Sequence, residues 1–220
     1  MSPHKHAYNL PLARATVLSC SACHPNLNES FNMTTPARST EDRAAILAAT
    51  AAWLEKAVIG LNLCPFAKSV HVKKQIRYVV SDASTPEELL AELLDELQTL
   101  SDSSPEEIDT TLLIHPDVLT DFLDYNEFLD VADAAVEDLD LEGELQVASF
   151  HPRFQFADTA PDDMGNYSNR SPYPTLHLLR EESIERAVEA FPQASGIFEN
   201  NIETLEKLGH EGWAKLMAVK

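Results

Sequence analysis

Apolar side chains recur every three or four residues along several stretches of the chain, which is the spacing of amphipathic helices. The first stretch follows Ser39, a residue type that caps helix N-termini, and ends at Gly60. The second follows Thr85-Pro86, where proline suits the first helical position, and runs to about Leu100. Further helical patterns cover residues 117–139, 184–191 and 194–208.

Short runs of aliphatic and β-branched residues lie between these helices and are typical of buried strands. They cover residues 76–81, 110–114, 145–150 and 175–179. Right-handed crossovers through helices of this length favour a parallel arrangement of the first three strands. The order of elements therefore predicts a single α/β domain with a mixed, mainly parallel four-stranded sheet and flanking helices.

Both ends of the chain lack these periodic patterns. Residues 1–38 are rich in Ser, Asn, Pro and His and are predicted to form a disordered tail, in which Met33 is an alternative start. The α/β domain is assigned to residues 39–210, and residues 211–220 to a C-terminal tail. Cys20 to His24 match the spacing of covalent haem attachment, but no signal-peptide core precedes them, so we expect no haem there.

The net charge of the chain excludes some classes of binding partner. The 220 residues include 16 basic and 36 acidic side chains, which gives a net charge of −20. Such a chain is repelled by nucleic acid and by anionic membranes, so we expect neither as a partner. From Asp82 to Glu144 there are 21 Asp and Glu residues and no Lys or Arg. We interpret this run as solvated helix faces, with a docking surface for a basic protein partner as the alternative.

Cysteine content and hydropathy indicate the compartment. The three cysteines are an odd number in a chain without an export signal, which favours a reducing, cytoplasmic location. No apolar run approaches the roughly 18 residues of a transmembrane helix.

Candidate chemistry gathers first at the ends of the predicted strands. Parallel strands bring their C-terminal ends to one edge, where open α/β sheets bind ligands. His115-Pro116 and His151-Pro152 stand at two such ends. An imidazole there can act as acid, base or metal ligand near neutral pH. Alternatively, each histidine caps the sheet and bonds a backbone carbonyl.

A second candidate is the segment from Ala157 to Pro174, which has no periodic pattern and is expected to fold over the sheet edge as a lid. It carries Asn166 and Asn169 as ligand-binding candidates. Arg170 is the expected clamp for a carboxylate or phosphate, because its guanidinium is a rigid fork of donors. The alternative is an ion pair between Arg170 and a nearby aspartate.

Three further residues complete the candidates. Cys64 lies between Gly60 and Pro65, outside regular structure, and is either a nucleophile or soft-metal ligand or a small buried apolar residue. His177 alternates with leucines on a strand and is either a catalytic base or a core residue. Arg180 is either a ligand-binding group or part of a cap. The residues of suitable type for a metal are Cys64, His151, Asp163 and His177.

Four blocks of sequence resemble one family. They are Gly60–Ala67 (GLNLCPFA), Ala148–Pro152 (ASFHP), Asn169–Pro174 (NRSPYP) and Leu176–Glu181 (LHLLRE). Together they resemble the bacterial family catalogued as domain of unknown function 1415, over about residues 42–208. The resemblance implies kinship, and no particular activity, cofactor or site.

The leading hypothesis is a cytoplasmic enzyme, or a cofactor- or metal-binding protein, that acts on a small anionic ligand. Cys64 is then a nucleophile or metal ligand, His151 or His177 a base, and Arg170 the anion clamp. The alternative hypothesis is a non-catalytic acidic adaptor or chaperone-like module that binds a basic protein.

Overall fold

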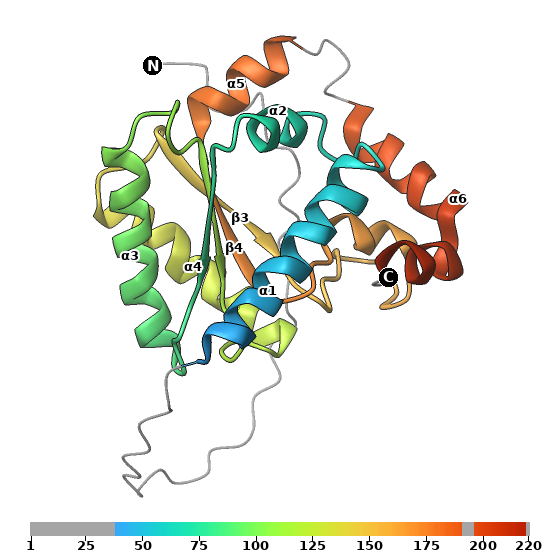
Figure 1. The fold of residues 1–220 in the computed structure, drawn as a ribbon, viewed down its shortest axis with the longest axis horizontal. Coiled ribbons are helices and arrows are strands. Elements are labelled where there is room, and N and C mark those ends of the chain that lie inside the picture. Colours follow the sequence, from blue (N-terminus) through green and yellow to red (C-terminus); the bar gives the residue numbers. More distant parts are fainter. Residues whose placement is uncertain (1–37, 191–195, 219–220) are drawn as a thin grey trace, which may run out of the picture.

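The computed structural model describes residues 38–190 and 196–218 (Figure 1). The predicted tail up to residue 37, the start at Met33 and the haem-attachment motif therefore lie outside the described residues. The strands are β1 (Ile76–Val80), β2 (Thr110–Ile114), β3 (Leu145–Phe150) and β4 (Thr175–Arg180). The helices are α1 (Thr40–Trp53) with its π-helical continuation η1 (Leu54–Ile59), α2 (Ala67–Val72), α3 (Pro86–Asp102), α4 (Phe122–Asp138), the 3-10 helix η2 (Met164–Asn169), α5 (Glu181–Ala190) and α6 (Ile197–Met217).

The four strands form one mixed sheet in the order β1-β2-β4-β3. Only β1 and β2 pair in parallel, whereas β4 is antiparallel to both of its neighbours. The prediction of a mainly parallel sheet is therefore wrong. The chain leaves the C-terminal end of β3 and enters β4 at that same end of the sheet, so β4 runs in the opposite direction to β3. The strands β1, β2 and β3 still point the same way, with β4 inserted between β2 and β3.

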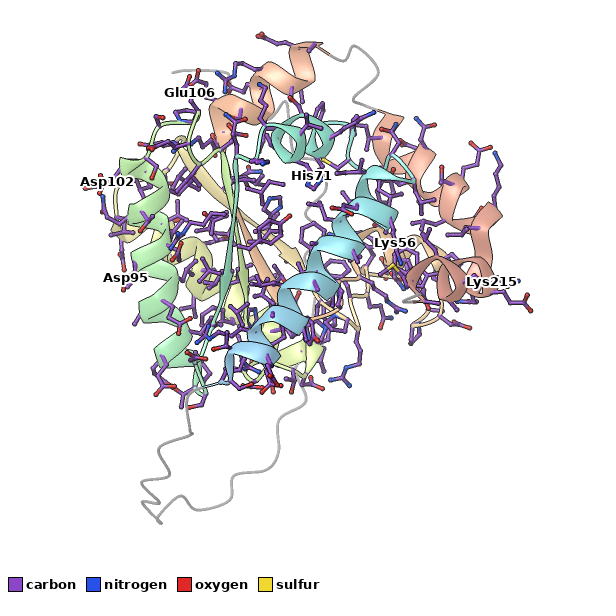
Figure 2. All side chains as sticks on the ribbon, in the orientation of Figure 1. Lys56, His71, Asp95, Asp102, Glu106 and Lys215 are labelled. Atoms are coloured by element: carbon purple, nitrogen blue, oxygen red, sulfur yellow. The ribbon has the colours of Figure 1, made fainter. Side chains whose placement is uncertain are left out.

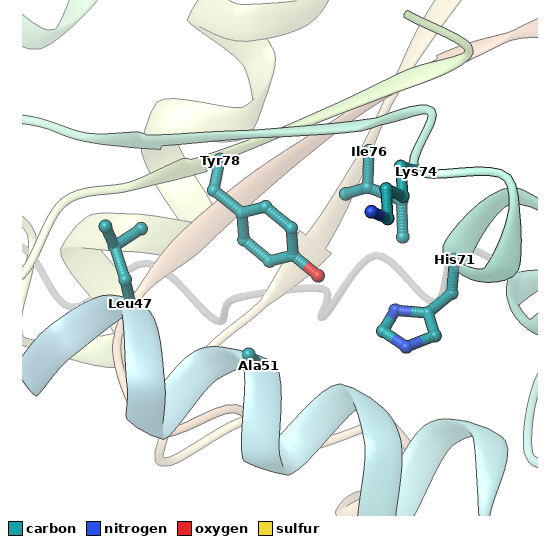
Figure 3. A pocket seen from close by; sticks show the side chains of 6 residues that line it. All are labelled: Leu47, Ala51, His71, Lys74, Ile76 and Tyr78. Atoms are coloured by element: carbon teal, nitrogen blue, oxygen red, sulfur yellow. The ribbon is translucent and has the colours of Figure 1, made fainter. Parts of the chain in front are cut away.

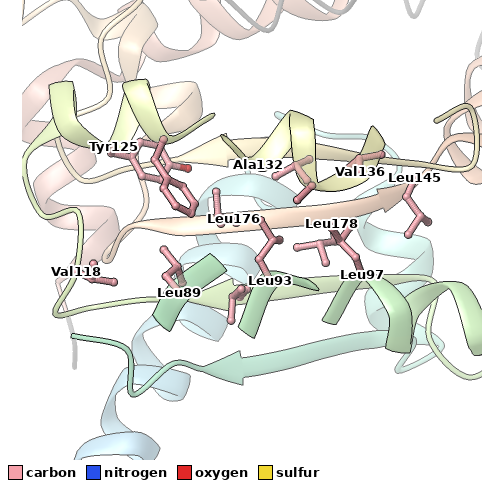
Figure 4. Close-up of a cluster of buried hydrophobic side chains, with 14 of the residues drawn as sticks. Leu89, Leu93, Leu97, Val118, Tyr125, Ala132, Val136, Leu145, Leu176 and Leu178 are labelled. Atoms are coloured by element: carbon pink, nitrogen blue, oxygen red, sulfur yellow. The ribbon is translucent and has the colours of Figure 1, made fainter. Parts of the chain in front are cut away.

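One face of the sheet packs against α3 and α4 (Figure 4). The leucine stripe of α3, Leu89, Leu93, Leu97 and Leu100, is fully buried there. The predicted cap at Thr85 is confirmed, because its side chain accepts a hydrogen bond from the backbone N–H of Glu88. By contrast, α4 begins at Phe122 and not near residue 117, since Asp121 provides its N-cap. Leu119, with φ of 54°, cannot belong to a right-handed helix.

The opposite face packs against α1 and η1. Trp53, Leu54, Ala57 and Val58 form a buried cluster there, and the end of α6 packs against it through Trp213, Leu216 and Met217. Residues 211–217, which were expected to form a tail, are thus part of α6. This helix has a kink at Gly209, where φ is 62° and ψ is 174°, a conformation that favours glycine. No helix among the described residues is long and apolar enough to cross a membrane.

Arg180 joins the end of α3 to the sheet. Its side chain is buried and donates to the backbone carbonyls of Leu100, Ser103 and Ile108. The last carbonyls of a helix lack the usual partners within it. The guanidinium gives Leu100 in the last turn of α3 a second donor beside the Ser103 N–H, and it bonds the carbonyl of Ser103 just after the helix. This arrangement assigns Arg180 a structural role as a cap.

We predict that Arg180→Met lowers the free energy of unfolding by about 2–4 kcal/mol, because it removes the charged donor from the carbonyls of Ser103 and Ile108. Denaturant unfolding measures this change. Arg186→Met is the matched control, since Arg186 is exposed, and it is expected to stay within about 0.5 kcal/mol of the wild type. A loss below about 1 kcal/mol for Arg180→Met would contradict the capping role.

Candidate functional site

A cavity of about 440 Å³ lies between α1, α2 and β1 (Figure 3). Leu47 and Ala51 of α1 and Ile76 of β1 form its apolar lining. Its polar lining consists of His71, Lys74 and Tyr78. Figure 3 shows the Tyr78 hydroxyl and the His71 ring facing the space between α1 and β1. The volume is within the range of about 300–1,000 Å³ that is usual for small-molecule sites.

The local sequence explains why these groups meet. Lys74 has a φ of 61°, and its backbone N–H donates to the carbonyl of His71, so the chain turns sharply from α2 into β1. This turn places His71 and Lys74 beside the strand. Alternation along β1 then directs Ile76 and Tyr78 toward α1 and sends Arg77 to the other face, where it bonds Glu96 of α3.

The segment that carries the polar lining of this cavity is basic, and its Lys74 lines the cavity. Residues 56–77 contain five Lys and Arg and no Asp or Glu, in a chain whose net charge is −20. Glu55 is the acidic neighbour, with its Oε1 at 3.5 Å from His71 Nε2. Burial, and in smaller part the carboxylate of Glu55, raises the pKa of Tyr78, so its hydroxyl stays protonated at neutral pH. The cavity thus combines a cationic rim, a phenolic hydrogen-bond donor and apolar walls.

The sheet edge holds the two predicted His-Pro dipeptides. His115 and His151 follow β2 and β3, which end at the same edge, and both are fully buried. Their rings pack on Tyr125 of α4, with centroid distances of 5.6 and 5.1 Å. His115 Nδ1 lies 3.0 Å from the carbonyl of Val118, and His151 Nδ1 accepts the backbone N–H of Arg153 at 3.0 Å. The Nδ1 atom of His115 thus bonds a backbone carbonyl, as the alternative interpretation expected, whereas that of His151 bonds a backbone amide.

Cys64 lies on the other side of the sheet from His151. It packs against the buried cluster of α1 and η1, whereas His151 packs against Phe122 and Tyr125 of α4. Burial raises the pKa of the Cys64 thiol, although backbone hydrogen bonds from Phe66 and Ala67 act in the opposite direction. A thiol that remains protonated is a poor nucleophile, so this environment fits a packing role.

His177 faces the same side of the sheet as Cys64, and its Nε2 is engaged in a hydrogen bond within the fold. Its Nε2 lies 2.8 Å from the hydroxyl of Thr110, and that hydroxyl lies 2.6 Å from the carbonyl of Leu178. Because the carbonyl only accepts, the hydroxyl donates to it and accepts from His177. Burial lowers the pKa of His177 to about 4, which makes it a weak base at neutral pH.

The predicted lid is folded by its own side chains. Asn166 is fully buried, and its amide bonds the backbone of Phe156 and Ala160 at 2.9 and 2.8 Å. Asn169 donates to the carbonyl of Ser149 at 3.2 Å. These two ligand-binding candidates therefore fix the segment to itself and to β3.

Arg170 bonds the backbone, and no carboxylate in residues 38–190 and 196–218 forms an ion pair with it. Its Nε donates to the carbonyl of Phe154 at 3.1 Å, and its Nη2 to that of Pro161. The guanidinium also lies over the ring of Tyr167, 4.3 Å from the centroid. Asp163 caps η2 by accepting the backbone N–H of Gly165 at 2.7 Å. These contacts hold the lid closed on itself.

The predicted metal ligands are not brought together. The sheet separates Cys64 and His177 from His151, and Asp163 is engaged at the start of η2. Within residues 38–190 and 196–218, no group of three or more His, Cys, Asp or Glu side chains is placed to hold a metal ion.

Sequence reasoning missed the residues of the cavity. His71, Lys74 and Tyr78 belong to no recognisable motif. The signal that was present is the basic run from Lys56 to Arg77, which stands out because the following 63 residues from Asp82 to Glu144 contain no basic side chain.

Comparison with known proteins gives one finding. A family model described as "Protein of unknown function (DUF1415)" matches residues 45–215, which is most of the chain. No curated protein and no solved structure shows significant similarity.

The buried histidines predict a pH dependence of stability. Desolvation lowers the pKa of His115 and His151 to about 4, below the value of about 6.5 in an unfolded chain. Between pH 6.5 and 5 the unfolded chain therefore binds more protons, and stability falls as the pH falls, by about 1 kcal/mol per pH unit for each histidine.

We predict that His151→Asn removes the contribution of one histidine from the slope of stability against pH. The asparagine oxygen still accepts the Arg153 N–H, but the side chain does not titrate. Denaturant unfolding at several pH values between 6.5 and 5 measures the slope. A slope equal to that of the wild type would show that His151 is protonated in the folded state.

Proposed function

Because the chain belongs to the DUF1415 family, whose description names no activity, we propose from the geometry alone that the protein binds a small organic anion in the cavity between α1, α2 and β1. The observation that carries the proposal is the ammonium group of Lys74 and the imidazole of His71 beside an apolar wall. This retains the small anionic ligand expected from the sequence and moves its site away from Cys64, His151 and Arg170.

The charge distribution supports an anionic ligand. Lys68, Lys73 and Lys74 are exposed on and just after α2, and no acidic residue lies between Lys56 and Arg77. Figure 2 places the labelled Lys56, His71 and Lys215 on the side of α1, α2 and α6, and the labelled Asp95, Asp102 and Glu106 at and beyond α3. A small anion is therefore attracted to the α2 side and repelled from the α3 side.

The walls support a ligand with an apolar body. Leu47, Ala51 and Ile76 offer no hydrogen-bonding side chain, so an aromatic or aliphatic group gains by leaving water against them. A carboxylate at the rim then meets Lys74, and the Tyr78 hydroxyl donates to one of its oxygens. The ligand class that satisfies both parts is a small aromatic or branched carboxylate.

We predict that benzoate binds to the wild-type chain and that Lys74→Gln weakens binding about fivefold, since an exposed charge pair contributes up to about 1 kcal/mol. Ala51→Leu, which fills the cavity, is expected to abolish binding. Isothermal titration calorimetry and benzoate-induced chemical-shift changes measure both effects.

Lys73→Gln is the matched control, because Lys73 carries the same charge next in sequence but does not line the cavity. Benzyl alcohol tests the need for the carboxylate and is expected to bind at least fivefold more weakly than benzoate. Equal losses for Lys73→Gln and Lys74→Gln, or unchanged binding by Ala51→Leu, would refute the assignment.

A second candidate function is favoured by the outer face of α4. Leu123 and Val131 are 53% and 40% exposed, two helical turns apart. Asp124 and Glu127 lie exposed between them. We propose that this face docks a basic amphipathic helix of another protein, in line with the adaptor hypothesis. Exposed apolar residues framed by acidic ones fit such a partner by both charge and shape.

A synthetic helix with a leucine stripe flanked by lysines tests this second function. We predict that Leu123→Ser with Val131→Ser weakens its binding about tenfold, whereas Val72→Ser, at an exposed apolar residue of α2, leaves it unchanged. Fluorescence anisotropy at two salt concentrations measures the affinity. Binding that depends on salt but not on the two apolar residues would mean non-specific attraction and would exclude a docking face.

A further inference from the structure

His71 is the residue through which pH can change the charge of the cavity between α1, α2 and β1. Five histidines lie in the described residues. Burial lowers the pKa of His115, His151 and His177 to about 4, so these three stay neutral between pH 6 and 8. His210 is exposed on α6 and does not line the cavity. Among the described histidines, His71 is therefore the one that can alter the charge at the cavity in this range.

The ring of His71 faces the cavity and also lies beside an acidic residue. Figure 3 shows the ring pointing into the space between α1 and β1. Its Nε2 lies 3.5 Å from Oε1 of Glu55, which belongs to η1, and η1 packs against α2. The side chains of His71 and Glu55 are 33% and 58% exposed, so water reaches both. The imidazole can therefore gain or lose a proton while the fold stays closed.

The backbone of η1 holds Glu55 in this position. Glu55 is the second residue of η1, and its carbonyl accepts the N–H of Gly60 at 3.0 Å, which is the i→i+5 bond of a π-helix. This wide turn requires glycine at position 60, because a Cβ there would lie 2.2 Å from the carbonyl oxygen of Lys56. The acidic partner of His71 is thus carried by a turn with a strict backbone requirement.

The other groups around this imidazole keep their charge between pH 6 and 8. Glutamate and lysine side chains are charged throughout this range, which applies to Glu55 in η1 and to Lys74 at the cavity. Burial, and in smaller part Glu55, raises the pKa of Tyr78 on β1, so its hydroxyl stays neutral. The lining from α1 is apolar. Lys68 and Lys73, on and just after α2, are exposed and outside the lining.

The balance of charge beside the cavity therefore depends on His71. While the imidazole is neutral, the carboxylate of Glu55 offsets the ammonium of Lys74. Once the imidazole is protonated, His71 and Lys74 together exceed Glu55 by one positive charge. A bound anion favours this protonated form, and by linkage the protonated form binds the anion more tightly. The affinity for an anion must then rise as the pH falls.

We propose that protonation of His71 regulates the cavity, so that a small organic anion binds more tightly at pH 6 than at pH 8. This regulation rests on the proposed function of the same cavity. Glu55 weakens anion binding while His71 is neutral, and the imidazolium cancels that effect when His71 is protonated. The cavity is thus loaded under mildly acidic conditions and emptied as the pH rises.

Benzoate titrations of the full chain at pH 8, 7 and 6, followed by isothermal titration calorimetry, test the proposal. Benzoate stays ionised over this range, because carboxyl groups titrate at about 4. The dissociation constant is expected to fall about three- to fivefold from pH 8 to pH 6, as one partly exposed charge allows. At pH 7, titrations in two buffers of different ionisation enthalpy are expected to show uptake of a fraction of a proton on binding.

Two variants, each with a matched control, assign the effect to the pair. His71→Gln is expected to bind benzoate with one affinity at all three pH values, whereas His210→Gln, at the exposed histidine of α6, keeps the wild-type dependence. Glu55→Gln is expected to tighten binding at pH 8 about threefold. Glu41→Gln, at an exposed acid in the first turn of α1, is expected to leave the affinity unchanged.

The outcomes separate the regulation from the function. Benzoate binding that does not depend on pH, or a dependence that persists in His71→Gln, would refute the regulation and leave the anion site in place. Binding that weakens as the pH falls would refute it as well. An unchanged affinity of Glu55→Gln at pH 8 would contradict the role of Glu55. Absence of benzoate binding at every pH would refute the function and the regulation together.

Discussion

The insertion of β4 between β2 and β3 is the constraint on which the rest of the structure depends. Because β4 is antiparallel to both neighbours, the chain re-enters the sheet at the same end at which it leaves β3. Residues 151–174 make this return, and the buried amide of Asn166 and the half-buried guanidinium of Arg170 bond their backbone internally. The segment that the sequence suggested as a lid over a ligand therefore serves as the connection between β3 and β4.

The two faces of this sheet present different chemistry. On the α3–α4 face His115 and His151 are buried beside the apolar core, where each ring bonds the backbone through Nδ1. On the α1 face the covering helices leave a cavity whose rim carries Lys74 and reaches water. Of the two faces, the α1 face is therefore the one on which the proposed ligand finds both a charged group and apolar area.

The sequence predicted the helices and strands, which depend on local periodicity. It did not predict the direction of β4, which depends on how the strands pair. Strand limits at Thr110–Ile114 and Leu145–Phe150 agree with the structure, as does the cap at Thr85. The antiparallel pairing of β4 was not predictable from helix lengths, because it depends on where the chain re-enters the sheet. Residue type alone likewise could not separate Arg170 as a backbone clamp from Arg170 as an anion clamp, since a guanidinium donates equally well to carbonyls and carboxylates.

Segregation of charge along the chain makes the proposed anion site compatible with a net charge of −20. Interactions between exposed charges are screened over about 10 Å at 0.1 M salt, so a small ligand near α2 responds to the five basic residues between Lys56 and Arg77 more than to the acidic residues beyond Asp82. Arg77 itself is turned to the far face and paired with Glu96. The attraction at the cavity therefore comes from the lysines of the α2 region, with Lys74 the one at its rim.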